Sequence, residues 1–175
     1  MTKREKLYQT AIECLGKDMA PYEDEYGCME ALNQVFKKAF GEEIGGGLST
    51  YRAYQILRID IRFQKALVPL KGDIIISPTG YGNGTFRNGH TGIVGEDEKV
   101  MSNTSANGLW LENYTLTSWK KRYKDYGGFP MAYFRVVGVM PEINATASTS
   151  KELAEIQQKI SWIQAIINSL KALRK

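Results

Sequence analysis

The spacing of apolar residues changes part-way along the chain, and this change restricts the folds that the chain can adopt. Residues 3–16 and 28–40 carry apolar side chains at helical intervals, and each run ends at a glycine. After a connection at Gly45–Gly47, which we expect to be flexible, a serine and a threonine open a third helix over residues 49–57. From residue 72 onward the apolar runs are short and rich in β-branched and aromatic residues. Helices followed by strands indicate an α+β fold, with the N-terminal helices packed on an antiparallel sheet.

The expected strands are separated by Gly, Asn, Asp and Pro. They lie at residues 72–76, 91–94, 99–101 and 133–137. A chain of 175 residues has room for one globular domain and a modest appendage. We therefore expect one domain over residues 1–140.

The remaining residues divide into a linker and a helix. Residues 141–150 are small and polar without an apolar period, which is typical of a linker. Residues 151–175 carry apolar residues at alternating spacings of three and four, as in a coiled coil. These residues are Leu153, Ile156, Ile160, Ile163, Ile167 and Leu170. Isoleucine at both seam positions favours a homo-oligomer through residues 153–173, as a trimer or tetramer.

Two alternatives remain for this C-terminal amphipathic helix. One is that its apolar face folds back onto the domain. The other is contact with an anionic membrane surface, which Trp162 and a basic end at residues 171–175 would suit.

The charge of the chain favours some partners over others. It has 23 basic and 19 acidic residues, a net charge of +4, and its basic residues are scattered. This balance fits an anionic partner such as a cell wall better than it fits a nucleic acid, and we expect no nucleic acid to bind. Residues 1–10 are charged and polar, so we expect synthesis in the cytoplasm without a signal peptide. No apolar run is long enough to cross a bilayer.

His90 is the only histidine, so a reaction that needs a base titrating near neutrality has one candidate. It follows Asn88-Gly89 and opens an expected strand, a rigid element that can aim a side chain into a cleft. A surface or structural role is the alternative.

Cys28 lies directly before the apolar period of the second helix. A helix N-terminus stabilises a thiolate, the nucleophilic form of cysteine. Cys14 lies inside the first helix and is expected to be a buried, inert thiol. The acidic residues at 23–25 and Glu30 would raise the pKa of Cys28 if they faced it, and would attract a cationic substrate if they faced outward.

These residues carry a resemblance to a known family. A cysteine opening an early helix, then Gly72-Asp73, then Gly89-His90, then Met101-Ser102-Asn103, resembles the CHAP and NlpC-type peptidoglycan hydrolases over roughly residues 20 to 137. The resemblance implies a papain-like fold and nucleophilic acyl transfer, with Cys28 attacking an amide carbonyl and His90 as general base. It also implies a polar residue on the following strand that orients the imidazole. We expect Asn103 in this third role, with Ser102 and Ser105 as alternatives.

The resemblance also suggests groups around the scissile bond. The backbone N–H of Cys28 would bind the oxyanion, helped by Tyr22 or Tyr26. Trp110 is a candidate for contact with glycan sugars, although aromatic residues at such spacing also form cores. We expect no metal and no other cofactor, because one histidine and two separated cysteines cannot build an ordinary zinc site without carboxylates, and no HExxH or paired CxxC motif is present.

The resemblance thus implies a peptidoglycan hydrolase, either an endopeptidase or an N-acetylmuramoyl-L-alanine amidase, that acts at the bacterial cell wall as a phage lysin does. Two other classes stay open. One is an inactive cell-wall-binding module of the same fold. The other is a cysteine peptidase acting on proteins.

Overall fold

The computed structural model describes residues 1–22, 27–104 and 107–138. The contacts divide the chain after Gly138, and the description below concerns the first unit, Met1–Gly138. The predicted domain end at residue 140, the linker over 141–150 and the C-terminal helix over 151–175 lie outside the described residues.

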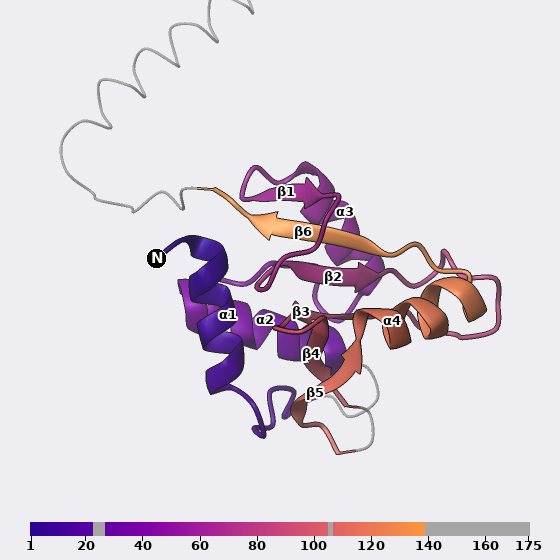
Figure 1. Cartoon of the computed structure of the whole chain (residues 1–175), viewed down its shortest axis with the longest axis horizontal. Helices are drawn as coiled ribbons and strands as arrows, with labels where there is room; N and C mark the ends of the chain where they lie inside the picture. Colours follow the sequence, from indigo (N-terminus) through magenta and orange to yellow (C-terminus); the bar gives the residue numbers. More distant parts are fainter. Residues whose placement is uncertain (23–26, 105–106, 139–175) are drawn as a thin grey trace, which may run out of the picture. The chain divides into compact units, whose positions relative to one another are not determined.

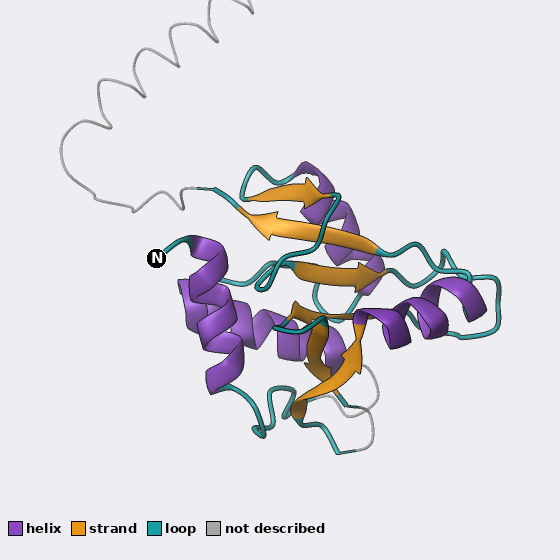
Figure 2. Ribbon diagram, viewed as in Figure 1, coloured by secondary structure: helices purple, strands orange, loops and turns teal. Residues whose placement is uncertain are grey.

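The described unit is an α+β domain, as the order of the apolar patterns predicts (Figures 1 and 2). Its helices are α1 (Lys3–Glu13), α2 (Gly27–Phe40), α3 (Thr50–Ile59), α4 (Leu116–Trp119) and the π-helix η1 (Lys120–Tyr126), which continues α4. Its strands are β1 (Phe63–Ala66), β2 (Ile74–Ser77), β3 (His90–Val94), β4 (Lys99–Asn103), β5 (Trp110–Thr115) and β6 (Ala132–Val136).

The strands form one six-stranded sheet in the order β1-β6-β2-β3-β4-β5, and all neighbours are antiparallel. Successive side chains of a strand point to opposite faces, so the sheet has two cores. On one face, Ile74 and Ile76 of β2 pack with α1, α2 and α3. On the other, Ile75 packs with Trp119 and Tyr123 of the α4–η1 segment. The cleft described below lies where elements of both cores meet.

Helix starts follow the capping signals of the sequence. Thr2 and Glu5 form a reciprocal capping box at the start of α1. The Ser49 hydroxyl accepts a hydrogen bond from the Arg52 N–H and caps α3, in agreement with the predicted start of the third helix.

Three elements were not predicted. In β1 only Phe63 is buried, and in β5 only Trp110 is, because both are edge strands with one partner each. Edge strands lack the alternating burial that produces a recognisable pattern. The α4–η1 segment buries Trp119 and Tyr123 among basic residues, which hides its apolar face.

The Gly72-Asp73 pair is a structural anchor. Gly72 has φ of +86°, and a Cβ there would lie 2.4 Å from the Arg4 carbonyl oxygen, so only glycine fits. The fully buried Asp73 carboxylate accepts hydrogen bonds from Arg135 Nε (3.0 Å) and Nη2 (2.8 Å) on β6, and from the Leu70 N–H. The turn that enters β2 is thereby tied to β6.

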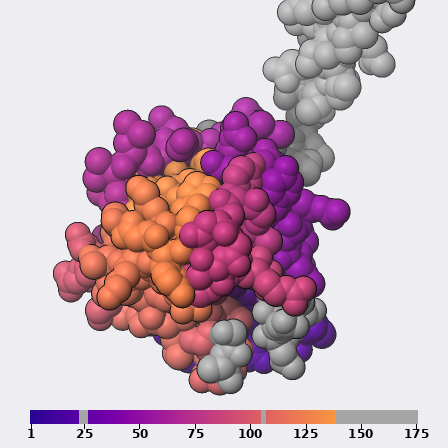
Figure 3. Space-filling model, turned by 90° about the vertical axis from the view of Figure 1, so that its right-hand side faces the viewer, coloured from indigo at the N-terminus to yellow at the C-terminus, as the bar shows by residue number. Residues whose placement is uncertain are grey.

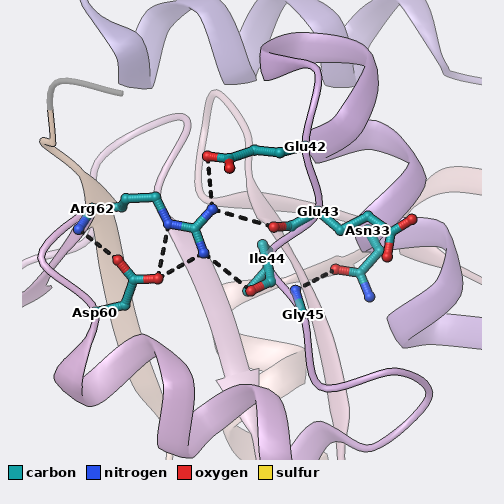
Figure 4. Close-up of polar contacts among 7 residues, drawn as sticks. All are labelled: Asn33, Glu42, Glu43, Ile44, Gly45, Asp60 and Arg62. Atoms are coloured by element: carbon teal, nitrogen blue, oxygen red, sulfur yellow. Dashed lines mark hydrogen bonds and ion pairs between the residues drawn. The ribbon is translucent and has the colours of Figure 1, made fainter. Parts of the chain in front are cut away.

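The glycine-rich connection after α2 is held by polar side chains (Figure 4). The buried Asn33 amide accepts a hydrogen bond from the Gly45 N–H and donates one to the Gly47 carbonyl. Arg62 forms ion pairs with Asp60 and Glu42 and donates hydrogen bonds to the carbonyls of residues 43 and 44. The expected flexible connection is therefore fixed at both ends, just before the residues 48–50 that reach the cleft.

Candidate active site

A cleft of about 510 Å³ is lined by both Cys28 and His90. Its walls come from the start of α2, the segment 48–50, the segment 86–90, the ends of β4 and β5, and η1. Figure 3 shows the face on which the segment before β3 (magenta) lies beside the α4–η1 region (orange). The Asn83 N–H donates to the Gly127 carbonyl at this contact.

Cys28 is a free, half-buried thiol in the first turn of α2, as predicted. Burial raises the pKa of the Cys28 thiol to about 11, while the backbone amides of Thr91, Met29 and Cys28 itself act in the opposite direction. The thiol is therefore protonated at neutral pH in the resting protein, and the expectation that this helix start stabilises a thiolate is wrong. Cys14 is fully buried at the end of α1, which agrees with an inert thiol.

His90 opens β3 and is held by a short relay of hydrogen bonds. Its Nε2 lies 3.0 Å from the Ser102 Oγ, and that hydroxyl donates to the Asn113 Oδ1 at 2.7 Å. Because the Ser102 proton is committed to Asn113, the hydroxyl accepts from His90, and Nε2 carries the imidazole proton. The other ring nitrogen, Nδ1, forms no hydrogen bond within the described ranges and is the basic nitrogen.

Aromatic rings surround the imidazole. Trp119 stacks on it at 5.2 Å and Tyr123 at 5.5 Å, and Tyr114 meets it edge-on at 5.8 Å between centroids. Burial among these rings, with a smaller contribution from the Arg122 charge, lowers the pKa of His90 to about 4. The imidazole is thus neutral at neutral pH.

Gly89 allows the backbone before His90 to pass unusually close to its neighbour. A Cβ at this position would lie 1.8 Å from the Ser77 carbonyl oxygen. The Gly89 N–H also donates to the Thr79 hydroxyl, which contacts Thr50 at the start of α3. Glycine at this position is therefore required for the placement of His90.

Cys28 and His90 line the same cleft without a hydrogen bond between them among the described contacts. The link between them is the backbone of Thr91, whose amide faces the Cys28 sulfur and which directly follows His90. The resting pair is a neutral thiol and a neutral imidazole. The imidazole stacks on Trp119 and Tyr123 on one face of the sheet, and α2 packs on the other face.

The structure assigns the imidazole contact to Ser102 and not to Asn103. In the β3–β4 register Ile93 faces Met101, so Ser102 shares the face of Gly92 and His90, while Asn103 shares the face of Thr91. Asn103 still lines the cleft, beside Gly27, and its buried Oδ1 has no hydrogen-bond partner. The prediction of Asn103 as the orienting residue is therefore wrong.

The three aromatic residues predicted to contact substrate lie in different environments. Trp110 is wholly buried in the helix-side core, so contact with a sugar is excluded by packing. Tyr22 is 86% exposed and does not line the cleft. Tyr26 lies outside the described residues. The rings that do line the cleft are those of Phe86, Tyr114 and Tyr123, and only their positions in the fold reveal this.

Metal sites, membrane-spanning helices and relatives were also considered for this chain. Among the residues that the structure describes, no group of three or more His, Cys, Asp or Glu side chains is arranged to hold a metal ion. In the same residues no helix combines the length and apolar character needed to span a membrane. Comparisons with models of protein families and with curated proteins find no match.

Proposed function

We propose that this protein is a papain-like cysteine peptidase or amidase that hydrolyses peptidoglycan. The observation that carries the proposal is the cleft shared by Cys28 and His90, with the imidazole held so that Nδ1 is its basic nitrogen. A nucleophile at a helix start, a base on a strand and a polar group orienting that base are the parts of a nucleophilic acyl transfer.

The proposed reaction starts from the neutral pair. The Cys28 proton moves to His90 Nδ1 as the sulfur attacks the amide carbonyl. The C–N bond then breaks, and the leaving amine takes the proton from His90. Water, deprotonated by His90, then attacks the thioester carbonyl. The C–S bond breaks, the carboxylic acid leaves, and His90 returns the proton to the Cys28 sulfur. The N–H of Cys28 is the proposed oxyanion donor, and Ser102 with Asn113 keeps the imidazole in one tautomer.

The choice of peptidoglycan as substrate, like the setting of a phage lysin acting at the cell wall, is supported by the sequence resemblance. The Gly-Asp anchor at the entry to β2 and the Gly-His pair at the entry to β3 are consistent with it. Self-association through residues 153–173 also remains a proposal from the heptad pattern.

The test compares the protein with Cys28→Ala and His90→Gln in a turbidity assay on purified cell walls, with casein cleavage run in parallel. We expect clearing of walls by the unaltered protein, loss of clearing in both variants, and no cleavage of casein. Mass spectrometry of the digest then identifies the bond. Clearing that persists in Cys28→Ala contradicts the proposal.

An inactive wall-binding module is the second candidate, favoured by two observations on Cys28. The Cys28 pKa near 11 and the absence of a described hydrogen bond to His90 leave the thiol unactivated at rest. Sedimentation with walls, without release of soluble fragments, is the result expected for this alternative.

A further inference from the structure

The charge of the cleft carries information about the substrate. The described residues that line it include two arginines, Arg87 and Arg122, and no aspartate or glutamate. His90 adds no positive charge at neutral pH, because burial keeps it neutral. The described walls are therefore cationic, which favours a negatively charged ligand and opposes the cationic substrate suggested by the acidic residues before Cys28.

Arg122 is held in place by aromatic rings. Its guanidinium lies 4.8 Å from the centroid of Phe86 and 5.6 Å from that of Tyr123. Both rings also line the cleft. An arginine side chain stacked on aromatic rings loses less conformational entropy on binding a ligand than a freely moving one does. The Arg122 guanidinium is therefore preorganised for a ligand.

The guanidinium has no carboxylate partner in the described part of the chain. Arg62 and Arg135, by contrast, pair with Asp60 and Asp73 respectively. A guanidinium presents two parallel N–H groups that match a carboxylate. Arg122, whose side chain bonds to Tyr123, therefore has N–H groups that can donate to a carboxylate of the ligand.

Arg122 is also close to the proposed base. Tyr123 contacts both groups, since its ring stacks on His90 at 5.5 Å and lies under Arg122 at 5.6 Å. A carboxylate bound by Arg122 would therefore be separated from the His90 imidazole by the Tyr123 ring alone.

We propose that the cleft binds acyl substrates carrying a free carboxylate near the scissile amide, and that Arg122 is the residue that selects for it. This inference rests on the proposed function for its meaning in catalysis. Its binding part is independent, because Cys28→Ala retains the whole cationic wall.

The experiment uses soluble disaccharide-peptides released from purified walls by a muramidase. One half is left native, and in the other half the carboxylates are converted to carboxamides with carbodiimide and ammonium. Binding of both pools to full-length Cys28→Ala is measured by calorimetry, and their hydrolysis by the unaltered protein is measured by mass spectrometry.

We expect the native pool to bind about tenfold more tightly than the amidated pool, the effect of one charge-assisted pair. Arg122→Gln in the Cys28→Ala background should remove this preference, and Arg122→Lys should keep part of it. Lys124→Gln is the matched control, since Lys124 is on the same helix, carries the same charge and does not line the cleft. That variant should keep the full preference.

Three outcomes overturn the inference. The first is equal binding of the two pools by Cys28→Ala. The second is a preference that survives Arg122→Gln, since another residue then selects the carboxylate. The third is a preference that disappears in Lys124→Gln, since the effect then belongs to overall charge. Failure of the proposed function looks different, because the pools would be distinguished in binding while neither is hydrolysed.

Discussion

His90 is the only histidine in the chain, so its protonation can be followed by NMR without assignment. The unfolded imidazole takes up a proton near pH 6.5, whereas the folded one does so near pH 4. Between these values the unfolded state binds more protons. Stability is therefore retained above pH 6.5 and is lost as pH falls from 6.5 to 4.

We expect this loss to be about 1–3 kcal/mol in the free energy of unfolding, and to be absent in His90→Gln. Urea denaturation of both proteins at pH 7.5 and pH 4.5 measures it. An imidazole that titrates near pH 6.5 in the folded protein contradicts the prediction.

Ser102 fixes the tautomer of His90, and this can be tested directly. In Ser102→Ala the Nε2 proton loses its acceptor, so the imidazole should populate both tautomers. We expect the ¹⁵N spectrum of His90 to show this change and kcat to fall about 100-fold, as for a misplaced base. Asn113→Leu should produce the same direction of change, because it removes the partner of the Ser102 hydroxyl. A single unchanged tautomer in Ser102→Ala would show that the relay has no orienting role.

At the residue scale, the sequence allowed the places of the candidate residues in the fold to be predicted better than their contacts. Cys28 and His90 could be singled out as candidates because each is chemically distinctive and opens a regular element. The choice between Ser102 and Asn103 depended on the strand register. Neighbouring residues of a strand face opposite sides, so an uncertainty of one position reverses the assignment.

The buried Asp73–Arg135 pair joins β2 to β6, and its two partners should not be equivalent. Asp73 is fully buried, whereas the Arg135 side chain is 29% exposed. Removing Arg135 leaves the buried Asp73 carboxylate without its cationic partner. Removing the Asp73 charge leaves a guanidinium that reaches water, which costs less.

We therefore expect Arg135→Met to lower the free energy of unfolding by about 3–5 kcal/mol, and Asp73→Asn to lower it less. Urea denaturation of each variant and of the double variant measures the difference. A double variant that loses less than the sum of the single variants supports direct coupling. Additive losses would contradict it.

At the element scale, central elements were predicted and edge elements were not. Ile74–Ser77 is buried on both faces, so its apolar run is continuous and easy to recognise. The segment 116–126 shows no clear helical apolar pattern, because its four lysines and arginines surround only two buried rings. Its identity depends on the packing of Trp119 and Tyr123 against the sheet, which is a tertiary effect.

At the scale of the whole molecule, the heptads beyond Gly138 predict an oligomeric state. If residues 153–173 associate as their heptads predict, light scattering should give three or four times the monomer mass for the full chain. A chain ending at Pro141 should be monomeric, because it lacks the seam. Equal monomer masses for both chains would remove the prediction of an oligomer.

Shortening the chain should also separate two activities. Turnover of soluble disaccharide-peptides should be unchanged, since all described cleft residues precede Gly138. Clearing of whole walls should fall, because a monomer binds the wall through one cleft and lacks the avidity of an oligomer with several. An equal fall in both assays would assign residues 142–175 a role in the cleft itself.

The close approach between Gly89 and the Ser77 carbonyl limits how this chain can diverge. Any other amino acid at position 89 would overlap that oxygen, so a distant homologue with this strand geometry must keep glycine immediately before its histidine, however far its surface has drifted. In a saturation library, position 89 should accept no replacement, whereas the exposed neighbours Arg87 and Asn88 should accept many.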